Sequence, residues 1–128
     1  MKPLVVKKLE SGQWEVYEEL EYHVGNKDSD EIIRVPKGTL TDFASVPRGL
    51  WNIFPPDGEY TSAAVVHDFI YGLRGKLPSK TYTREEADKI FAEAMQVLGV
   101  PFWKRYTMFY AVRAGGWVYW NKKISKAE

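Results

Sequence analysis

The segment AAVVHDFIYGL, Ala63 to Leu73, constrains the fold more than any other part of the chain, because it is apolar on nearly every side of a helix. At about 100° per residue, one broad arc of the helix holds four large apolar side chains, those of Val65, Val66, Phe69 and Ile70. A helix that is apolar almost all round is buried on most of its sides. We therefore expect this helix to lie at the centre of the fold.

Two polar residues, His67 and Asp68, stand side by side in the middle of this segment. On the helical wheel His67 falls between Ala63 and Tyr71, and Asp68 falls near Ala64, so neither residue has the surroundings of a solvated face. A buried carboxylate is costly unless it is paired or bound to a metal. Asp68 must therefore have a partner, which is a cation, a basic side chain or a set of N–H donors.

The composition is that of a globular protein of one domain. The chain has 128 residues, of which 45% are hydrophobic, and this is enough to bury a core. The net charge of +1 provides no electrostatic footprint for nucleic acid, so no nucleic-acid partner is expected. The absence of cysteine excludes disulfides, cysteine-ligated zinc and a cysteine nucleophile. We expect no signal peptide and no transmembrane segment, and therefore a cytoplasmic location.

Residues 1–40 are predicted to be mainly β. Apolar and polar residues alternate from Trp14 to Val24, which is typical of a half-buried strand, and Glu18 is the one break in the apolar row. The turn-forming sequence GNKDSD separates this strand from EIIRV, so the two segments predict a hairpin. The segment from Leu4 to Val6 is a candidate third strand.

Residues 41–60 contain Pro and Gly residues that forbid a long regular element, so we expect an ordered loop there. Residues 61–121 are predicted to be helical, and residues 122–128 to form a tail. The sequence thus predicts an α+β fold with one domain, 1–128, in which a small antiparallel β-sheet precedes a bundle of about three α-helices.

The first helix is expected to run from about Thr61 to Gly72. The second begins at TREEADKIF, where Thr83 and Glu86 have the spacing of a capping box, and it closes at Gly99. The third runs from residue 101 towards 120, and the glycine pair at 115–116 is the place where it would kink or be interrupted.

Asp88 lies at the edge of the apolar stripe of the second helix, near Met95 on the wheel. The link between the first two helices is short, so they are expected to pack antiparallel and to bring Asp88 to His67. A carboxylate that holds a histidine fixes its tautomer and stabilises the imidazolium formed when the ring takes a proton, which is the basis of general-base catalysis. The alternative interpretation is an exposed aspartate on a helix surface.

The predicted loop contributes further charged candidates. One interpretation places Asp42 beside His67 and Asp68 as a third acidic group, with Arg48 as an anion clamp. The other makes Asp42 a turn or cap residue and Arg48 the counter-ion of Asp68, in a buried polar network that ties the loop to the helix. The chain has two histidines and no His-x-x-x-His pair, so a zinc hydrolase is less favoured, and His23 is expected to be solvated on a strand.

Ser45, Trp51 and Phe54 are the remaining candidates in the loop, and together with Arg48 they are assigned to a substrate pocket. Ser45 lacks the Gly-x-Ser-x-Gly context of a strained nucleophile elbow, which makes it a weak acyl nucleophile and leaves a turn or cap role open. Trp51 and Phe54 precede the histidine-containing helix, where they are placed to form the mouth of a pocket.

The third helix is rich in aromatic and basic residues. One interpretation is that the aromatic side chains pack in the core, and this is the one we favour. The other is that they lie on an anionic membrane surface, assisted by the basic residues Lys104, Arg105, Arg113, Lys122 and Lys123.

Two resemblances add to these observations. The sequence TDFASVPRGLWNIFPPDGEYTSAAVVHDFIYG, followed by TREEADKIFAEAM and LGVP, resembles domain-of-unknown-function family 1353, a small phage- and prophage-borne family, over roughly Val35 to Trp120. This resemblance implies a phage context, and with it a phage or host protein as partner and a virion-associated location as an alternative. It implies no particular activity.

The second resemblance is local. HDFIYG is similar to the H-D-x-x-Y signature of secreted phospholipases A2, and DKIFAEAM resembles the second-helix segment of their prokaryotic members. The similarity implies that His67 activates water, that Asp88 orients His67, and that Tyr71 donates a hydrogen bond to Asp88. It also implies a Ca²⁺ ion on Asp68, for which Asp42 is our added candidate ligand. The chain lacks the disulfides and the glycine-rich calcium loop of those enzymes.

We therefore expect a phage-associated hydrolase of ester bonds, with a phospholipid among the candidate substrates, that uses a His67–Asp88 dyad. The competing hypothesis is a non-catalytic phage structural or host-interaction protein, in which the same His, Asp and Arg residues form a buried structural network.

Overall fold

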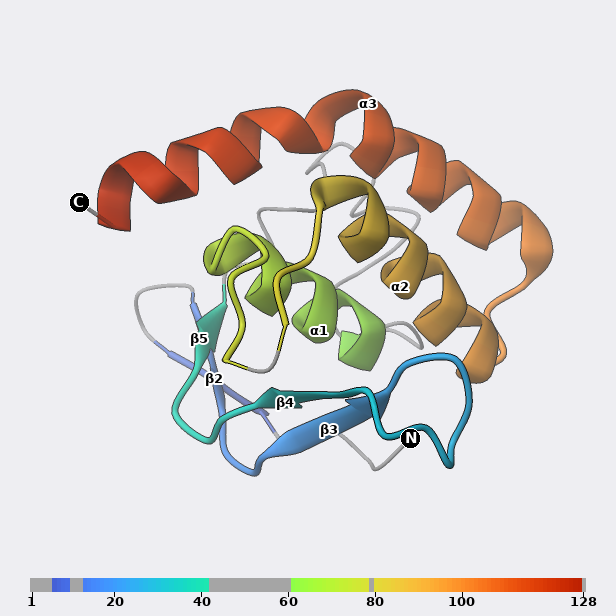
Figure 1. Ribbon diagram of the computed structural model, residues 1–128, viewed down its shortest axis with the longest axis horizontal. Coiled ribbons are helices and arrows are strands. Elements are labelled where there is room, and N and C mark those ends of the chain that lie inside the picture. Colours follow the sequence, from blue (N-terminus) through green and yellow to red (C-terminus); the bar gives the residue numbers. More distant parts are fainter. Residues whose placement is uncertain (1–5, 10–12, 42–60, 79, 128) are drawn as a thin grey trace.

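The computed structural model describes residues 6–9, 13–41, 61–78 and 80–127, and it shows an α+β fold (Figure 1). Short strands precede the helices, as predicted. The strands are β1 (Val6–Lys8), β2 (Trp14–Val16), β3 (Leu20–His23), β4 (Ile32–Val35) and β5 (Leu40–Thr41). The helices are α1 (Thr61–Gly72), α2 (Arg84–Val97) and α3 (Phe102–Ala127).

The strands form two small antiparallel sheets rather than one. β2 pairs with β1 and β5 in the order β1-β2-β5, while β3 pairs with β4 in a hairpin. The single strand predicted from Trp14 to Val24 is therefore wrong, because the chain bends at Glu18 and its two halves join different sheets. Glu18 is also the residue that breaks the apolar alternation. The two-residue strand β5 is too short to leave a periodic pattern, and the sequence did not predict it.

The hairpin β3–β4 has one buried and one polar face. Leu20 and Tyr22 are buried, and Tyr22 lies directly opposite the buried Ile33. On the other face an exposed ion pair joins Arg34 Nε to Glu21 Oε2 at 2.9 Å. The period-two pattern thus places the apolar face of the hairpin against the helices.

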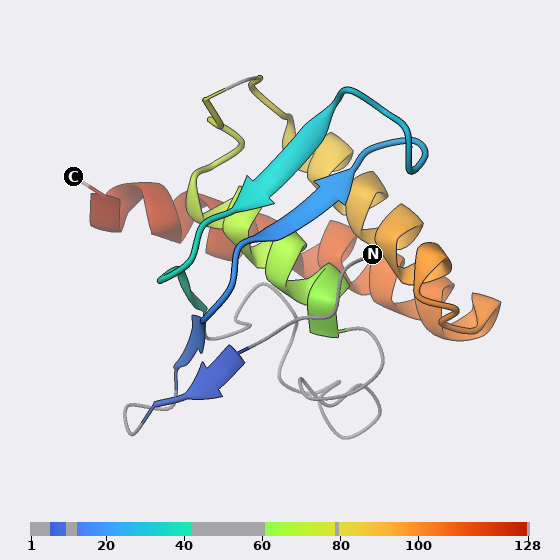
Figure 2. The ribbon, with the colours of Figure 1, turned by 90° about the horizontal axis from the view of Figure 1, so that it is seen from below.

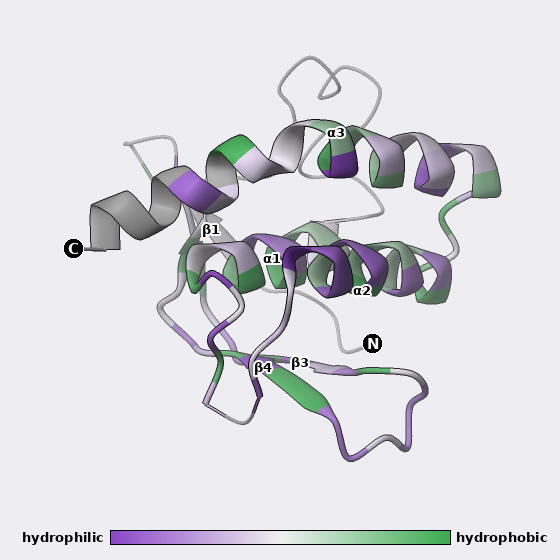
Figure 3. Cartoon of the chain, turned by 45° about the horizontal axis from the view of Figure 1, so that its top comes forward, coloured by the Kyte–Doolittle hydropathy of each residue, from purple (hydrophilic) through white to green (hydrophobic). Residues whose placement is uncertain are grey.

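The helices form two layers above the hairpin (Figures 1 and 2). α1 and α2 run antiparallel next to the strands, and α3 arches over them on the far side (Figures 1 and 3). α1 contacts β4, β5, α2 and α3, so it is enclosed on most sides, as its sequence predicted. Its buried residues are Ala63, Ala64, Val65, Val66, His67, Asp68, Ile70 and Tyr71.

The link between α1 and α2 turns tightly, and α2 has defined ends. Gly75 has a φ of 79°, and a Cβ on it would lie 1.9 Å from the carbonyl oxygen of Tyr82, so only glycine fits there. The predicted capping box is confirmed: Thr83 Oγ1 accepts from the Glu86 N–H, and Glu86 Oε1 accepts from the Thr83 N–H. Gly99, just beyond α2, adopts a φ of 81°.

α3 is one continuous helix, so it is not interrupted at Gly115 and Gly116. It also extends past the boundary predicted at residue 121, to Ala127. The residues after 121 include Lys and Ala, which favour the helical conformation. In the described part of the chain no helix has both the length and the apolar character needed to span a membrane.

We expected the aromatic residues of α3 to pack in the core. This expectation is wrong for most of the aromatic side chains of α3 that the structure describes. Among the described residues of α3, those that are buried are spaced four residues apart, at Met108, Val112 and Gly116. This stripe of smaller residues packs against α1 and α2 and turns the large rings outward. The exposed aromatic residues, each with more than half of its surface in solvent, are Phe102, Trp103, Tyr106, Tyr110 and Trp117.

Candidate functional site

The predicted contact between the first two helices is present. His67 Nε2 lies 2.8 Å from Asp88 Oδ1, and the Tyr71 hydroxyl donates to the same oxygen at 2.5 Å. His67 and Tyr71 are one turn apart on α1 and therefore face α2 together. All three side chains are fully buried, at 0% exposure.

The contact defines the chemistry of the histidine ring. An ionised carboxylate only accepts hydrogen bonds, so His67 Nε2 carries a proton and donates it to Asp88. In the neutral imidazole the basic nitrogen is then Nδ1. A carboxylate in this position would stabilise the imidazolium that forms when Nδ1 takes up a proton.

The second oxygen of Asp88 is held by two arginines. Arg113 Nη1 donates to Asp88 Oδ2 at 2.9 Å, and Arg84 Nη1 lies 3.6 Å from the same oxygen. Arg84 also donates to the backbone carbonyl oxygens of Val112 and Arg113, at 3.0 and 3.1 Å, and so ties α2 to α3. Asp88 is therefore the point at which all three helices meet.

Neither arginine was identified as part of the site from the sequence. Arg84 lies one turn before Asp88, and this ion-pair spacing is a signal that was available in the sequence. Arg113 lies on another helix, and no local pattern associates it with Asp88.

The surroundings of Asp88 act on its pKa in opposite directions. Burial raises the pKa, but the hydrogen bond and charge of His67, with the hydrogen bonds of Tyr71 and Arg113, lower it. The net effect holds the pKa of Asp88 below its ordinary value, so the group is ionised at neutral pH. Burial, followed by the effect of Asp88, raises the pKa of Tyr71 well above its ordinary value, and its hydroxyl remains a proton donor.

Aromatic packing fixes the orientation of the histidine ring. Phe91 stacks on the His67 ring with 4.5 Å between centroids, and the Tyr71 ring lies 4.3 Å from it. Trp120 from α3 packs edge-on against Tyr71 at 5.0 Å. The ring is therefore preorganised, and its hydrogen bond to Asp88 costs little further ordering.

Gly116 allows α3 to approach this site. A Cβ on Gly116 would lie 2.6 Å from the Tyr71 hydroxyl oxygen and 3.2 Å from Arg84 Nη1. Gly115, the preceding residue, has open space at the same position. The sequence indicated the glycine pair as a place for a kink. In the structure Gly116 instead allows α3 to pack closely against Tyr71 and Arg84.

Asp68 has a different environment. It is buried, and the hydroxyl of Thr41, in β5, donates a hydrogen bond to Asp68 Oδ2. Its burial agrees with the sequence expectation, but this partner is a hydroxyl group, which is none of the three kinds of partner that were expected. Within the described residues no group of three or more His, Cys, Asp or Glu side chains is arranged to hold a metal. Five predicted site residues lie outside the described residues, namely Asp42, Ser45, Arg48, Trp51 and Phe54.

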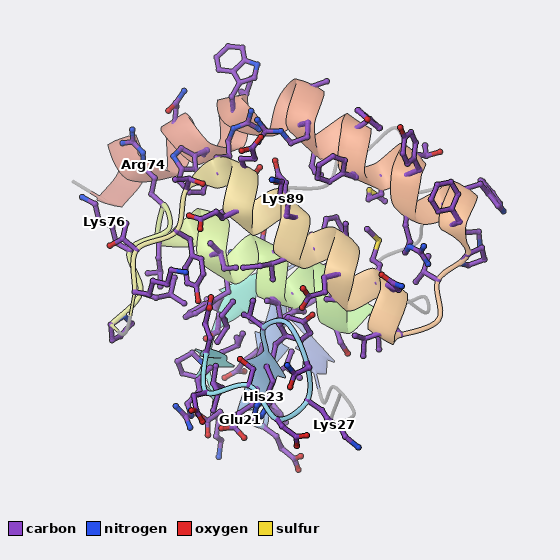
Figure 4. All side chains as sticks on the ribbon, turned by 45° about the vertical axis from the view of Figure 1, so that its right-hand side comes forward. Glu21, His23, Lys27, Arg74, Lys76 and Lys89 are labelled. Atoms are coloured by element: carbon purple, nitrogen blue, oxygen red, sulfur yellow. The ribbon has the colours of Figure 1, made fainter. Side chains whose placement is uncertain are left out.

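The second histidine is separate from the site. His23 lies on β3 at the strand end of the molecule, near Glu21 and Lys27 and away from the helices' shared interior (Figure 4). It is partly buried rather than fully solvated, and its Nδ1–H donates to the carbonyl oxygen of Ser29 at 2.9 Å. This contact closes the turn after the strand.

Comparison with known proteins places the chain in a family. Residues 14–112 match the family described as "Protein of unknown function (DUF1353)". The chain belongs to this family. It is also similar to the uncharacterized protein y4jT of Sinorhizobium fredii, with 33% identity over 98 residues. That match covers 73% of this chain but 27% of the relative, so the chain spans about a quarter of the longer protein's length. No solved structure matches the chain.

The glycine pair of α3 provides a first test. Gly116→Ala is expected to lower the free energy of unfolding by about 1–3 kcal/mol, because the new methyl group overpacks the buried Tyr71 hydroxyl. Gly115→Ala is the matched control, and it should raise stability by up to about 1 kcal/mol, since alanine is the better helix former. Urea unfolding measures both. Equal effects of the two substitutions would contradict the close approach at Gly116.

The depressed pKa of Asp88 predicts acid sensitivity. In the unfolded chain the carboxyl takes up its proton near its ordinary pKa of about 3.9, whereas the folded protein resists protonation until a lower pH. The stabilisation by Asp88 is therefore complete above about pH 5 and is lost as the pH falls through the folded pKa.

Arg113→Gln should lower stability at neutral pH by about 1–2 kcal/mol and flatten this acid dependence, because it removes one of the interactions that depress the pKa of Asp88. Urea unfolding between about pH 6 and pH 2 gives the profile. Arg34→Gln, which breaks an exposed ion pair, is the control and should leave the profile nearly unchanged. An Arg113→Gln profile that runs parallel to the parent would contradict the assignment.

Proposed function

We propose that this protein is a hydrolase of ester bonds, with phospholipid-type esters as the first candidate substrates, and that His67 is its general base. The observation that carries the proposal is the arrangement around Asp88. One carboxylate oxygen binds His67 and Tyr71, and the other binds Arg113. This arrangement fixes the tautomer that leaves Nδ1 basic, which a general base requires.

In the proposed reaction His67 Nδ1 removes a proton from a water molecule. The oxygen of that water attacks the ester carbonyl, and the imidazolium formed is stabilised by Asp88. When the carbon–oxygen bond of the leaving group breaks, the imidazolium returns the proton to the departing alkoxide. Tyr71 and Arg113 are positioning residues, because they act on Asp88.

Two resemblances support the proposal. HDFIYG and DKIFAEAM resemble the histidine helix and the aspartate helix of prokaryotic phospholipases A2, and the contacts from His67 and Tyr71 to Asp88 are those that the resemblance implies. A phage or prophage setting, with a role in the host cytoplasm or the virion, is part of the proposal because the family resemblance suggested it.

Calcium is proposed as an assisting ion. The residue that would hold it is Asp68, since its buried carboxylate is of the oxygen type that Ca²⁺ prefers. The Thr41 hydroxyl donates a hydrogen bond to the Asp68 carboxylate, and Asp42 follows Thr41 in the sequence. A bound Ca²⁺ would polarise the ester carbonyl.

A second candidate function rests on a different observation. His67, Tyr71 and Asp88 are fully buried, and two arginines neutralise the carboxylate. These features favour a structural network that fixes the packing of three helices in a non-catalytic phage structural or host-interaction protein. The first proposal requires substrate access to His67 Nδ1, and activity measurements separate the two.

His67→Asn is expected to lower ester hydrolysis by about 10²- to 10⁴-fold, the usual contribution of a general base. Tyr71→Phe should give a smaller loss of kcat, because it removes one hydrogen bond to Asp88 while leaving the ring in place. Hydrolysis of p-nitrophenyl esters and of phospholipid vesicles is measured at a temperature where circular dichroism shows each variant to be folded.

The same substitution at the other histidine, His23→Asn, is the matched control and should leave the rate unchanged, since His23 lies in the hairpin. The enzyme hypothesis would be rejected if the parent protein hydrolyses no ester in this panel and His67→Asn only lowers stability. That result would favour the structural network.

Calcium has its own test. If Ca²⁺ binds at Asp68, adding it should raise the melting temperature of the parent protein, and Asp68→Asn should abolish the rise. Mg²⁺ at the same concentration is the control ion, because it strips its water less readily and fits fewer sites. The absence of a Ca²⁺ effect on the parent would remove the ion from the proposal without affecting the dyad.

A further inference from the structure

The outward side of α3 carries a set of exposed rings, which we call the aromatic face and define as Phe102, Trp103, Tyr106, Tyr110 and Trp117. Phe102, Tyr106 and Tyr110 follow one another at four-residue intervals, and neighbouring rings are 5.4 and 4.6 Å apart. The hydroxyl groups of Tyr106 and Tyr110 are 3.0 Å apart. Since these three rings pack on one another, they form a contiguous part of the aromatic face.

Exposure of so many large rings on one helix is costly in water. Exposed apolar residues that are scattered singly are normal, but a contiguous patch marks an interaction site. Tryptophan and tyrosine are the side chains enriched where a membrane meets water, because each combines an apolar ring with a polar group.

The charge of α3 indicates which surface the aromatic face would meet. From Phe102 to Ala127 the helix sequence contains no Asp or Glu, and its basic residues are Lys104, Arg105, Arg113, Lys122, Lys123 and Lys126. The whole chain has a net charge of only +1, so positive charge is concentrated on this helix. Arg113 is engaged with Asp88, and Arg105 Nη1 donates to the backbone carbonyl oxygen of Val100 at 3.0 Å. Lys104 and Arg105 both lie beside rings of the aromatic face.

The basic and aromatic groups are combined locally. Lys104 Nζ lies over the Trp103 ring at 5.6 Å from its centroid, and the Arg105 guanidinium lies over the Phe102 ring at 5.5 Å. Apolar rings that enter a headgroup layer would therefore carry cations to the depth of the lipid phosphates. Figure 3 shows apolar and polar residues interleaved along α3 rather than one apolar band.

A groove of about 380 Å³ opens beside the aromatic face, between α2 and α3. Phe102, Tyr106 and Phe109 line it from α3, and Lys89 lines it from α2. Glu93 also lies on its wall, but its carboxylate accepts hydrogen bonds from the Tyr22 hydroxyl and from the Gly25 N–H. The groove thus has apolar walls and two cations on its lining, Lys89 and Arg105. Lys89 also lies 4.0 Å from the exposed Glu85 carboxylate, and Arg105 also donates to the Val100 carbonyl oxygen.

We propose that the aromatic face and its flanking basic residues form a docking surface for an anionic phospholipid bilayer. The helix that carries this surface, α3, lies on the opposite side of the molecule from the strands (Figures 1 and 2). This inference does not depend on hydrolysis, because none of the residues that carry it belongs to the His67–Asp88 site.

Vesicle co-sedimentation tests the inference. The full chain should bind vesicles of phosphatidylcholine mixed with phosphatidylglycerol, bind vesicles of phosphatidylcholine alone much more weakly, and be released by salt. The double substitution Trp103→Ala with Tyr110→Ala should weaken binding by about tenfold or more. Lys104→Gln should weaken it by about fivefold, the effect of one basic residue near an anionic surface.

Tyr17→Ala is the matched control, because Tyr17 is an exposed aromatic residue between β2 and β3, on the other side of the molecule, and its loss should not change binding. Melting temperatures confirm that each variant is folded. No binding to anionic vesicles, equal binding to neutral ones, or binding that survives the double substitution would overturn the inference.

Two other partners for the aromatic face, a nucleic acid and a second copy of the chain, are tested by binding and sedimentation measurements on the same variants. If the protein prefers a single-stranded oligonucleotide to the vesicles, the aromatic face is assigned to nucleic acid. If vesicle binding is absent and sedimentation velocity shows self-association that the double substitution abolishes, the face is assigned to a second copy of the chain. Either result would overturn the lipid assignment.

Discussion

The Asp88 carboxylate is an ion with no contact with solvent, and the packing of the helices is organised around that constraint. A buried charge is tolerated only when it is paired and hydrogen-bonded. α1 supplies His67 and Tyr71, α2 supplies Arg84 and α3 supplies Arg113, so each helix contributes at least one donor or cation. Removal of any one helix would leave the carboxylate short of a partner, and the three are therefore energetically coupled.

The same arrangement serves either functional interpretation. A catalytic dyad needs a histidine with a fixed tautomer, and a structural network needs a fully satisfied carboxylate. Both needs are met by the contacts of His67 and Asp88. The two interpretations differ in access to His67 Nδ1 and in the role of Asp68. Asp68 is the next residue on α1, and its buried carboxylate accepts a hydrogen bond from Thr41 in β5.

The two sides of α3 have different properties. Its inner side, with Gly116 against Tyr71, is shaped for close packing on the site. Its outer side presents rings and positive charge to the surroundings. If the outer side meets a lipid surface, the site and the surface are held by one rigid element, and an enzyme that acts on lipid would keep a constant position relative to the bilayer.

The sequence by itself determined the α+β class, the limits of α1 and the capped start of α2, and it predicted the pairing of His67 with Asp88 as one of two interpretations. These features are encoded locally: periodicity and caps act within one element, and the short link forces two helices together. Only the tertiary structure decided that Arg113 and Gly116 belong to the site and that the rings of α3 face outward. Those facts depend on which side of α3 packs against α1 and α2. An aromatic helix offers several apolar sides of similar hydrophobicity, and the close fit of Met108, Val112 and Gly116 selects among them.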